Sequence, residues 1–214
     1  MDDTPMTTAL LSTTYFGPVQ WYQKLCHYDH ILIEQHETFQ KQTFRNRCLI
    51  ATTQGIQVLT VPISTGDSHA IKDILISDHG NWRHLHWQAL QSAYGDSPFF
   101  EYYADDLRPF FEKKWDYLLD FNEAIRQKMC ELLDIDPQVG YTSSYQPLST
   151  LTSQHSVTND FRTTIDPKHP AADADFTPCR YYQVFEQKHG FLPNLSILDL
   201  LFNMGPKSVF YLIR

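Results

Sequence analysis

The chain has 214 residues, of which 42% are hydrophobic, 20% charged and 14% aromatic, and its formal net charge at pH 7 is −8. This composition excludes a disordered, collagenous or low-complexity chain, because bulky side chains bury enough apolar surface to offset the entropy of ordering. The net negative charge argues against a general nucleic-acid or anionic-membrane binder, since such partners are recognised mainly by Lys and Arg.

The first 80 residues are predicted to be mostly strands, with one helix. A β-prone run covers Thr8 to Phe16, and the polar residues 1–7 before it are expected to be frayed. Gly17-Pro18 then starts a helix over residues 19–29, because proline is favoured in a first helical turn. Further strands are predicted for four segments, of which the middle two form a hairpin: 30–35, 48–53, 56–63 and 71–77.

The middle of the chain is predicted to be helical. One helix starts after Asn81, a residue type that caps helix N-termini, and ends at Tyr94 before Gly95. The segment 106–133 repeats apolar residues every three or four positions and predicts one long helix.

The last third is predicted to be irregular before a short final helix. Residues 134–180 are rich in Ser, Thr, Asp and Pro and predict a long loop or lid-like segment. A strand over 181–186 and a helix over 196–204 follow. Length and element order predict a single α+β domain over residues 1–214, with a strand-rich N-terminal part and a helical part after it.

Nothing in the sequence indicates a targeting or membrane-spanning segment. Acidic Asp2 and Asp3 precede the first cation, Lys24, whereas a signal peptide has a basic start before its apolar run. No run approaches the roughly 18 apolar residues that a membrane-spanning helix requires. The four cysteines are scattered and predict reduced thiols. We therefore expect a cytoplasmic protein.

Common nucleotide-binding and hydrolase signatures are absent, so no cofactor is predicted. The closest histidine pair, His84 and His86, would lie about 200° apart on a helix, which prevents both from ligating one metal ion. No metal site is predicted.

Three cations lie within seven residues of this otherwise acidic chain: Lys41, Arg45 and Arg47. On a strand all three share one face, and on a helix Lys41 and Arg45 are one turn apart. Either arrangement is able to bind phosphate or carboxylate, because a guanidinium group pairs with both. The alternative is a solvated face in which the cations pair with Glu34 or Glu37.

Two other positions are candidate catalytic groups. His86 shares a helix face with Trp82, and an imidazole is able to act as a general base near neutral pH. A hydrogen-bonded buried histidine is the alternative. Asp199 lies between apolar residues, where a buried carboxylate is costly and a candidate for function. The spacing Ser196-x-x-Asp199 is also a capping-box pattern, which would give Asp199 a structural role.

Four segments together resemble the WbqC-like family: YFGPVQWYQKL at 15–25, KQTFRNR at 41–47, Trp82-x-x-x-His86 and SILDLLFNMG at 196–205. The resemblance covers most of the chain in matching order. It implies a bacterial protein of surface-polysaccharide (O-antigen type) biosynthesis, without specifying a reaction.

The chain departs from the family pattern near its start. Leu11 stands where typical members have a histidine, Thr13 replaces a proline, and Gly17-Pro18 replace Pro-Trp. If that histidine is catalytic in the family, this chain has an altered substrate or no catalysis.

The leading hypothesis is a transferase that acts on an activated sugar or acyl donor, such as a nucleotide sugar. In it His86 is the general base, Asp199 or another carboxylate orients the imidazole, and fixed cations stabilise the negative charge on the leaving oxygens. The residues expected to bind this small anionic ligand are Tyr15, Lys24, Lys41, Arg45, Asn46, Arg47, Trp82 and Asn203.

A non-catalytic module that binds a glycan or a protein is the alternative. Its contact surface would be the aromatic runs at 99–103 and at Tyr181-Tyr182, because aromatic rings offer apolar faces with polar tips. Ordinary packing in the core is the favoured explanation of these runs.

Overall fold

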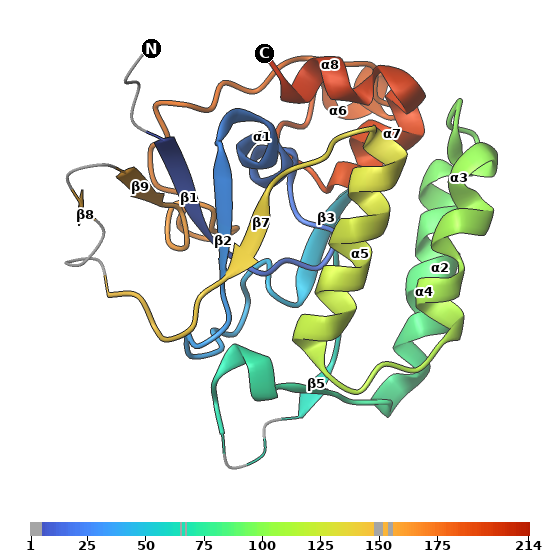
Figure 1. Ribbon diagram of the computed structural model, residues 1–214. Coiled ribbons are helices and arrows are strands. Elements are labelled where there is room, and N and C mark those ends of the chain that lie inside the picture. The colour runs from blue at the N-terminus through green and yellow to red at the C-terminus, as the bar shows by residue number, and fades with distance from the viewer. Residues whose placement is uncertain (1–5, 65, 67, 148–151, 154–155) are drawn as a thin grey trace.

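A five-stranded sheet with the order β7-β2-β1-β9-β8 is the centre of the computed structural model (Figure 1). The structure describes residues 6–64, 66, 68–147, 152–153 and 156–214. Four strands are parallel to one another: β1 (Met6–Ser12), β2 (His30–Glu34), β7 (Val139–Tyr141) and β9 (Ser156–Asp160). The short β8 (Thr152–Ser153) pairs antiparallel with β9.

The strand order reverses direction at β1. Helix α1 (Val19–His27) connects β1 to β2, and the chain later returns as β7 on the far side of β2. It then crosses to the opposite side of β1 and forms β9. Central strand β1 is buried over Ala9, Leu10 and Leu11, as expected for a parallel strand between two neighbours.

In the sequence, two small antiparallel sheets follow β2 and precede the helical part of the chain. The predicted hairpin is confirmed as β3 (Arg47–Thr52) and β4 (Gly55–Thr60), with Gly55 in the positive-φ conformation that its turn requires. Strand β5 (Ile63–Ser64) pairs with β6 (Leu75–Ile76). The strand predicted for 71–77 is wrong in its first half, because Ile71–Asp73 form a 3₁₀ turn, η1, that buries Ile71.

The predicted helix after Asn81 is confirmed as α2 (Trp82–Tyr94), which follows the 3₁₀ turn η2 (His79–Asn81). Asn81 itself has a left-handed backbone, and its side chain makes no capping hydrogen bond. Three more helices follow: α3 (Phe100–Leu107), α4 (Pro109–Glu112) and α5 (Leu118–Leu133). In Figure 1 the helices α2 to α5 stand to one side of the sheet.

The prediction of one helix over 106–133 is wrong. The chain leaves the helical conformation between α4 and α5, where the Ile76 amide donates to the Asp116 carbonyl and the Leu118 amide donates to the Ile74 carbonyl. Apolar residues recur on both sides of this break because both helices bury a face in the core. The spacing of apolar residues therefore continues across the break between α4 and α5, although the helix itself does not.

Residues 134–180 are not simply a loop, because they contain β7 and β9 of the main sheet. The strand predicted for 181–186 is also wrong: this stretch is irregular and leads into α6 (Glu186–His189). At the N-terminus, residues 1–5 of the segment predicted to be frayed lie outside the described residues. Met6 and Thr7 belong to β1 and pair with β9, so that part of the prediction is wrong.

The predicted C-terminal helix is confirmed as α7 (Ile197–Met204), followed by a 3₁₀ turn, η4 (Gly205–Ser208), and α8 (Val209–Leu212). Helices α7 and α8 pack against α1, and α7 also contacts β3. Mixed helices and strands confirm the α+β class. Among the described residues, every helix is too short or too polar to cross a bilayer.

Candidate functional site

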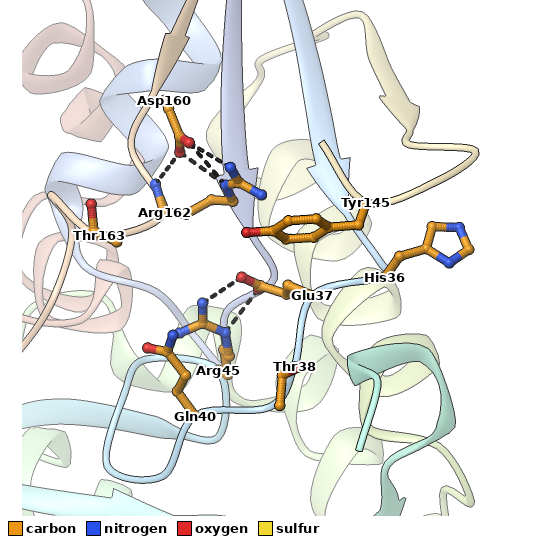
Figure 2. A pocket seen from close by; sticks show the side chains of 9 residues that line it. All are labelled: His36, Glu37, Thr38, Gln40, Arg45, Tyr145, Asp160, Arg162 and Thr163. Atoms are coloured by element: carbon orange, nitrogen blue, oxygen red, sulfur yellow. Dashed lines mark hydrogen bonds and ion pairs between the residues drawn. The ribbon is translucent and has the colours of Figure 1, made fainter. Parts of the chain in front are cut away.

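Polar and charged residues gather where the parallel strands end. Strand β1 ends at Ser12, β2 at Glu34 and β9 at Asp160, and parallel pairing brings these ends to one edge of the sheet. A cavity of about 360 Å³, here called the crevice, opens at this edge (Figure 2). It is lined by His36, Glu37, Thr38, Gln40, Arg45, Tyr145, Asp160, Arg162 and Thr163.

This position matches the place where open sheets with parallel strands bind ligands. Their ligands lie outside the carboxyl ends of the strands, at the point where the strand order reverses. In this chain the reversal is at β1, and the crevice draws on the residues that follow its two neighbours, β2 and β9. The fold therefore singles out the crevice as the candidate site.

Arg45 and Glu37 form the lower pair in the view of Figure 2. The Arg45 Nε donates to Glu37 Oε1 at 2.8 Å, and Nη2 donates to Glu37 Oε2 at 2.6 Å and to Ser12 Oγ at 2.8 Å. Both side chains are buried. Arg45 thus has the pairing with Glu37 that was considered for the cationic segment, but as a buried pair and not on a solvated face.

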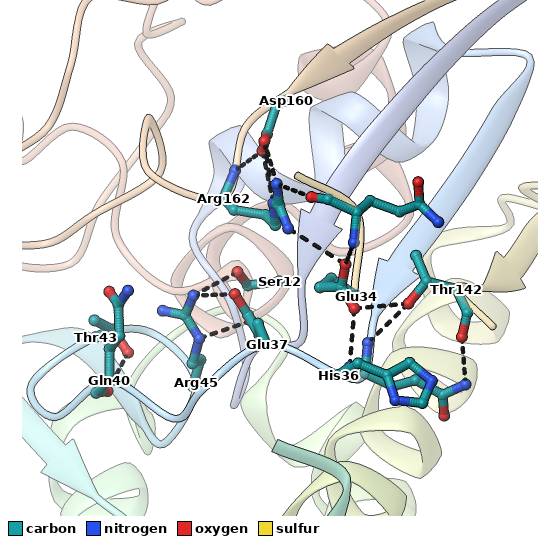
Figure 3. A network of polar contacts seen from close by, with 12 residues as sticks. Ser12, Glu34, His36, Glu37, Gln40, Thr43, Arg45, Thr142, Asp160 and Arg162 are labelled. Atoms are coloured by element: carbon teal, nitrogen blue, oxygen red, sulfur yellow. Dashed lines mark hydrogen bonds and ion pairs between the residues drawn. The ribbon is translucent and has the colours of Figure 1, made fainter. Parts of the chain in front are cut away.

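Arg162 forms the second pair and uses all three guanidinium nitrogens (Figure 3). Its Nε and Nη2 donate to Asp160, with Nε at 3.0 Å from Oδ1, while Nη1 donates to Glu34 Oε2 at 3.3 Å. Nη2 also donates to the Gln146 carbonyl at 2.8 Å. The Tyr145 ring centroid lies 5.2 Å from the guanidinium carbon, in a cation–π contact.

Glu34 accepts hydrogen bonds from several segments of the network. Its side chain is fully buried and accepts from the His36 amide at 2.8 Å and from Thr142 Oγ1 at 2.7 Å. The other oxygen accepts from the Gln146 amide at 2.9 Å and from Arg162. These bonds fix the ends of β2, β7 and β9 relative to one another, so the walls of the crevice are preorganised.

The crevice carries no excess positive charge. Glu34, Glu37 and Asp160 are three carboxylates against the two guanidinium groups of Arg45 and Arg162, so the formal charge of this set is −1. A phosphate would meet arginines that already hold carboxylates. A neutral ligand with many hydroxyl groups fits better, because carboxylate, amide and hydroxyl groups all hydrogen-bond to it.

The other predicted cations lie elsewhere. Lys41, Asn46 and Arg47 line a second cavity of about 420 Å³, between the loop that precedes β3 and the segment after β4. The cationic segment is therefore divided: Arg45 belongs to the crevice, and Lys41 and Arg47 belong to a separate groove.

His86 is a buried, hydrogen-bonded imidazole. Its Nδ1 lies 2.9 Å from the Tyr15 hydroxyl, and its ring packs against Trp82. Burial lowers the pKa of His86 to about 4, although a hydrogen bond with the Thr60 backbone acts in the opposite direction. The imidazole is therefore neutral at pH 7, and its catalytic role stays a prediction.

Asp199 lies in a different hydrogen-bond network from His86. It accepts from Tyr94 at 2.8 Å, Tyr181 at 2.7 Å and Gln183 at 2.9 Å. Burial raises the pKa of Asp199, and hydrogen bonds from these three donors lower it.

A capping box would have the Asp199 carboxylate accept from the Ser196 amide. The carboxylate accepts from side chains instead, so this part of the predicted capping box is wrong. Ser196 itself caps α7, because its Oγ accepts from the Leu198 amide. Neither Asp199 nor His86 lines the crevice.

The remaining predicted binding residues have structural partners. Lys24 is buried and forms an ion pair with Asp173 at 2.8 Å. Trp82 donates from Nε1 to the Ser77 carbonyl at 3.0 Å, and Asn203 donates to the Asp199 carbonyl at 2.7 Å. The structure does not bring these residues to the crevice, and their binding roles stay predictions.

Sequence reasoning missed three residues of the crevice, one between β7 and β8, one at the end of β9 and one after β9. Tyr145, Asp160 and Arg162 fall in the segment predicted to be a loop. The only local signal was the β-branched pair Val157-Thr158 in a short polar run, with an arginine two residues after Asp160. No group of three or more His, Cys, Asp or Glu side chains in the described part of the chain is able to hold a metal ion.

The family assignment comes from comparison with known proteins. The sequence model of the WbqC-like protein family matches residues 13–211. The chain belongs to the WbqC-like protein family. All residues that line the crevice of this WbqC-like protein lie inside the matched region.

One curated relative matches this WbqC-like protein over almost its full length. It is "Uncharacterized protein Rv1507c" of Mycobacterium tuberculosis (strain ATCC 25618 / H37Rv), 29% identical over 223 residues that cover 95% of this chain and 96% of the relative. No solved structure matches the chain.

Proposed function

We propose that this WbqC-like protein is a cytoplasmic enzyme of bacterial surface-glycan (O-antigen type) biosynthesis that binds the sugar part of its substrate in the crevice. One observation carries the proposal: two arginine–carboxylate pairs surround a cavity at the point where the strand order reverses. The glycan context comes from the family resemblance. A nucleotide sugar or a similar activated donor is the expected substrate.

The chemistry of the lining supports a sugar. Carboxylate oxygens of Glu37 and Asp160 accept hydrogen bonds from hydroxyl groups, while Gln40 and Thr163 both donate and accept. Tyr145 is 53% exposed and offers a ring face on which the apolar side of a sugar stacks. The volume of about 360 Å³ lies within the usual range of small-molecule sites.

A transfer reaction needs a group that accepts the proton of the attacking hydroxyl. Glu37 and Asp160 are the carboxylates in the crevice, and each is held by an arginine in a fixed orientation. A carboxylate positioned in this way serves as a general base when the acceptor hydroxyl lies within hydrogen-bond distance. We therefore expect glycosyl or acyl transfer to a sugar hydroxyl.

The test is a binding screen with UDP-, GDP- and dTDP-linked sugars and the corresponding free sugars, using isothermal titration calorimetry. Tyr145→Ala is expected to weaken the binding of a sugar ligand about tenfold, which is the size of a lost aromatic contact. Tyr117→Ala is the matched control, because Tyr117 is also exposed, at 43%, and lies outside the crevice and outside the aromatic runs. Equal binding by the two variants, or no sugar bound by the wild-type protein, contradicts the proposal.

A non-catalytic glycan- or protein-binding module is the second candidate. Tyr102, which is 73% exposed, and Tyr182 support it, whereas Phe100, Tyr103 and Tyr181 of the same aromatic runs are buried in the core. Turnover decides between the two. Binding of a donor without any release of its nucleotide, in the presence of sugar acceptors, favours the module.

A further inference from the structure

The groove beside the crevice has its own set of lining residues. It has a volume of about 420 Å³ and lies between the loop before β3 and the segment after β4. The residues that line it are Phe39, Lys41, Gln42, Asn46, Arg47, Thr60, Val61, Pro62 and Ile63. None of them lines the crevice, although both cavities draw on the loop over residues 36–46.

The groove is positively charged. Lys41 is exposed, and Arg47 is half-buried at the first position of β3. No carboxylate among the described residues lines the groove, and within the described ranges 6–64, 66, 68–147, 152–153 and 156–214 no residue forms an ion pair with either cation. This differs from the crevice, where each arginine holds at least one carboxylate.

Two buried polar atoms of the groove residues lack hydrogen-bond partners within the described part of the chain. Arg47 Nε is a donor without an acceptor, and Asn46 Oδ1 is an acceptor without a donor. The amide orientation of Asn46 is set by its other atom, because Nδ2 donates to the Val61 carbonyl at 2.8 Å. Native proteins leave few buried polar atoms unpaired, so each calls for an explanation.

The loop that carries these groups is held in place from several sides. Thr43 Oγ1 donates to the Gln40 carbonyl at 2.8 Å, and Asn122 donates to the Arg45 carbonyl at 2.8 Å. Gln42 has a φ of 65°, in the left-handed region that costs energy for a residue with a side chain. Lys41 and Arg47 are thus presented by a loop with defined geometry.

We infer that this groove is a binding site for a phosphate ester of a hydroxylated molecule. Phosphate oxygens accept from Arg47 and attract the Lys41 ammonium group, because a guanidinium group pairs well with phosphate. A hydroxyl group next to the phosphate donates to Asn46 Oδ1. The ligand therefore satisfies both unpaired atoms. This inference goes beyond the sugar site of the crevice and does not require that site to bind.

The experiment measures the affinity of glucose 1-phosphate and of sulfate for the full chain by isothermal titration calorimetry at low ionic strength. Glucose 1-phosphate is expected to bind more tightly than sulfate, because sulfate has no hydroxyl group to donate to Asn46. Arg47→Gln and Lys41→Gln are each expected to weaken glucose 1-phosphate binding about tenfold, since each removes a charged partner. Circular dichroism confirms that both variants fold.

Two control variants remove the same charges elsewhere. Lys207 is exposed outside the groove, and Arg108 is an exposed residue paired with Glu112, so Lys207→Gln and Arg108→Gln are expected to bind as the wild-type protein does. Unchanged affinity in Arg47→Gln and Lys41→Gln overturns the inference, and so does an equal loss in the control variants. Tyr145→Ala separates the two proposals, because it is expected to leave glucose 1-phosphate binding to the groove intact.

Discussion

Arg162 reaches from the residues after β9 to Glu34 at the end of β2, with Nη1 and Oε2 3.3 Å apart. Strand β1 lies between these two strands, so the ion pair crosses over its C-terminal end. Both side chains are buried. The pair thus joins two segments far apart in the sequence and holds the ends of β2 and β9 in a fixed position next to the crevice.

We expect Arg162→Leu to lower the free energy of unfolding by about 3 kcal/mol, because it leaves Glu34 and Asp160 buried without their cation. Urea denaturation followed by circular dichroism measures this change. The matched control is Arg108→Leu, since Arg108 pairs with Glu112 on the surface of the protein. An exposed pair of this kind contributes less than about 1 kcal/mol. Similar losses in the two variants contradict the structural role given to Arg162.

Acid sensitivity is expected from the buried Lys24–Asp173 pair. Burial raises the pKa of Asp173, but hydrogen bonds from Lys24 and Gln20 outweigh it, so the pKa lies below its ordinary value. Because the folded-state pKa is the lower one, the stabilisation is complete above the unfolded value near 3.9 and is lost as the pH falls through the folded value.

Asp173→Asn tests this expectation. At pH 6 the substitution is expected to cost about 3 kcal/mol of unfolding free energy, because Lys24 stays buried without its partner. At pH 2 the difference from the wild-type protein is expected to be smaller, since below the ordinary pKa the unfolded state already binds the proton and the stabilisation by the ionised Asp173 declines. Urea midpoints at the two pH values measure it, and a difference that does not change with pH contradicts the assignment.

Sequence patterns predicted the elements whose signals are local. Strand β2 has the apolar run ILI, the β3–β4 hairpin has a turn at Gly55, and helix α7 follows a capping Ser196, and the structure has all three close to the predicted bounds. Such patterns did not predict that Ser196 is buried or that its Oγ donates a hydrogen bond to the Phe16 carbonyl. They depend on the packing of segments far apart in the chain.

The crevice was not predictable because its strands are defined by distant pairing. Strand β9 has a polar sequence and becomes a strand through its parallel register with β1, in which Leu10 is opposite Asp160. The local pattern of apolar and polar residues does not indicate which distant strand will be the partner. Asp160 and Arg162 were consequently assigned to a loop, although they contribute the larger part of the network around the crevice.

The cationic segment over residues 41–47 shows that predicting which side chains share a face requires a regular helix or strand. Strand and helix alternatives both placed Lys41 and Arg45 on one face, but the segment is a loop until Arg47 begins β3. Irregular backbone has no fixed side-chain period, so neighbouring residues point to two cavities. The residue types indicated an anion site, which stays a prediction, and only the structure showed that Arg45 pairs with Glu37.

His86 is expected to make the protein less stable in mild acid. Its pKa, lowered by burial to about 4, lies below the ordinary value of 6.5, so the unfolded state binds a proton first as the pH falls. The unfolding free energy is therefore expected to decline by up to about 1.4 kcal/mol per pH unit between pH 6.5 and pH 4. His86→Gln removes this slope, whereas His84→Gln, at an exposed position of α2, retains it. Equal slopes in all three proteins contradict this account.

Asp199 is expected to stabilise the packing of α7. Its two oxygens accept from Tyr94, Tyr181 and Gln183, and Tyr94 also accepts from the Ala51 amide of β3. In Asp199→Asn an amide group replaces one acceptor and faces donors, which costs about 2 kcal/mol of unfolding free energy. The control Asp105→Asn, on the exposed face of α3, is expected to stay within about 0.5 kcal/mol of the wild-type protein. A stable Asp199→Asn protein without transferase activity supports the catalytic role that the sequence predicted, and a destabilised protein with retained activity excludes it.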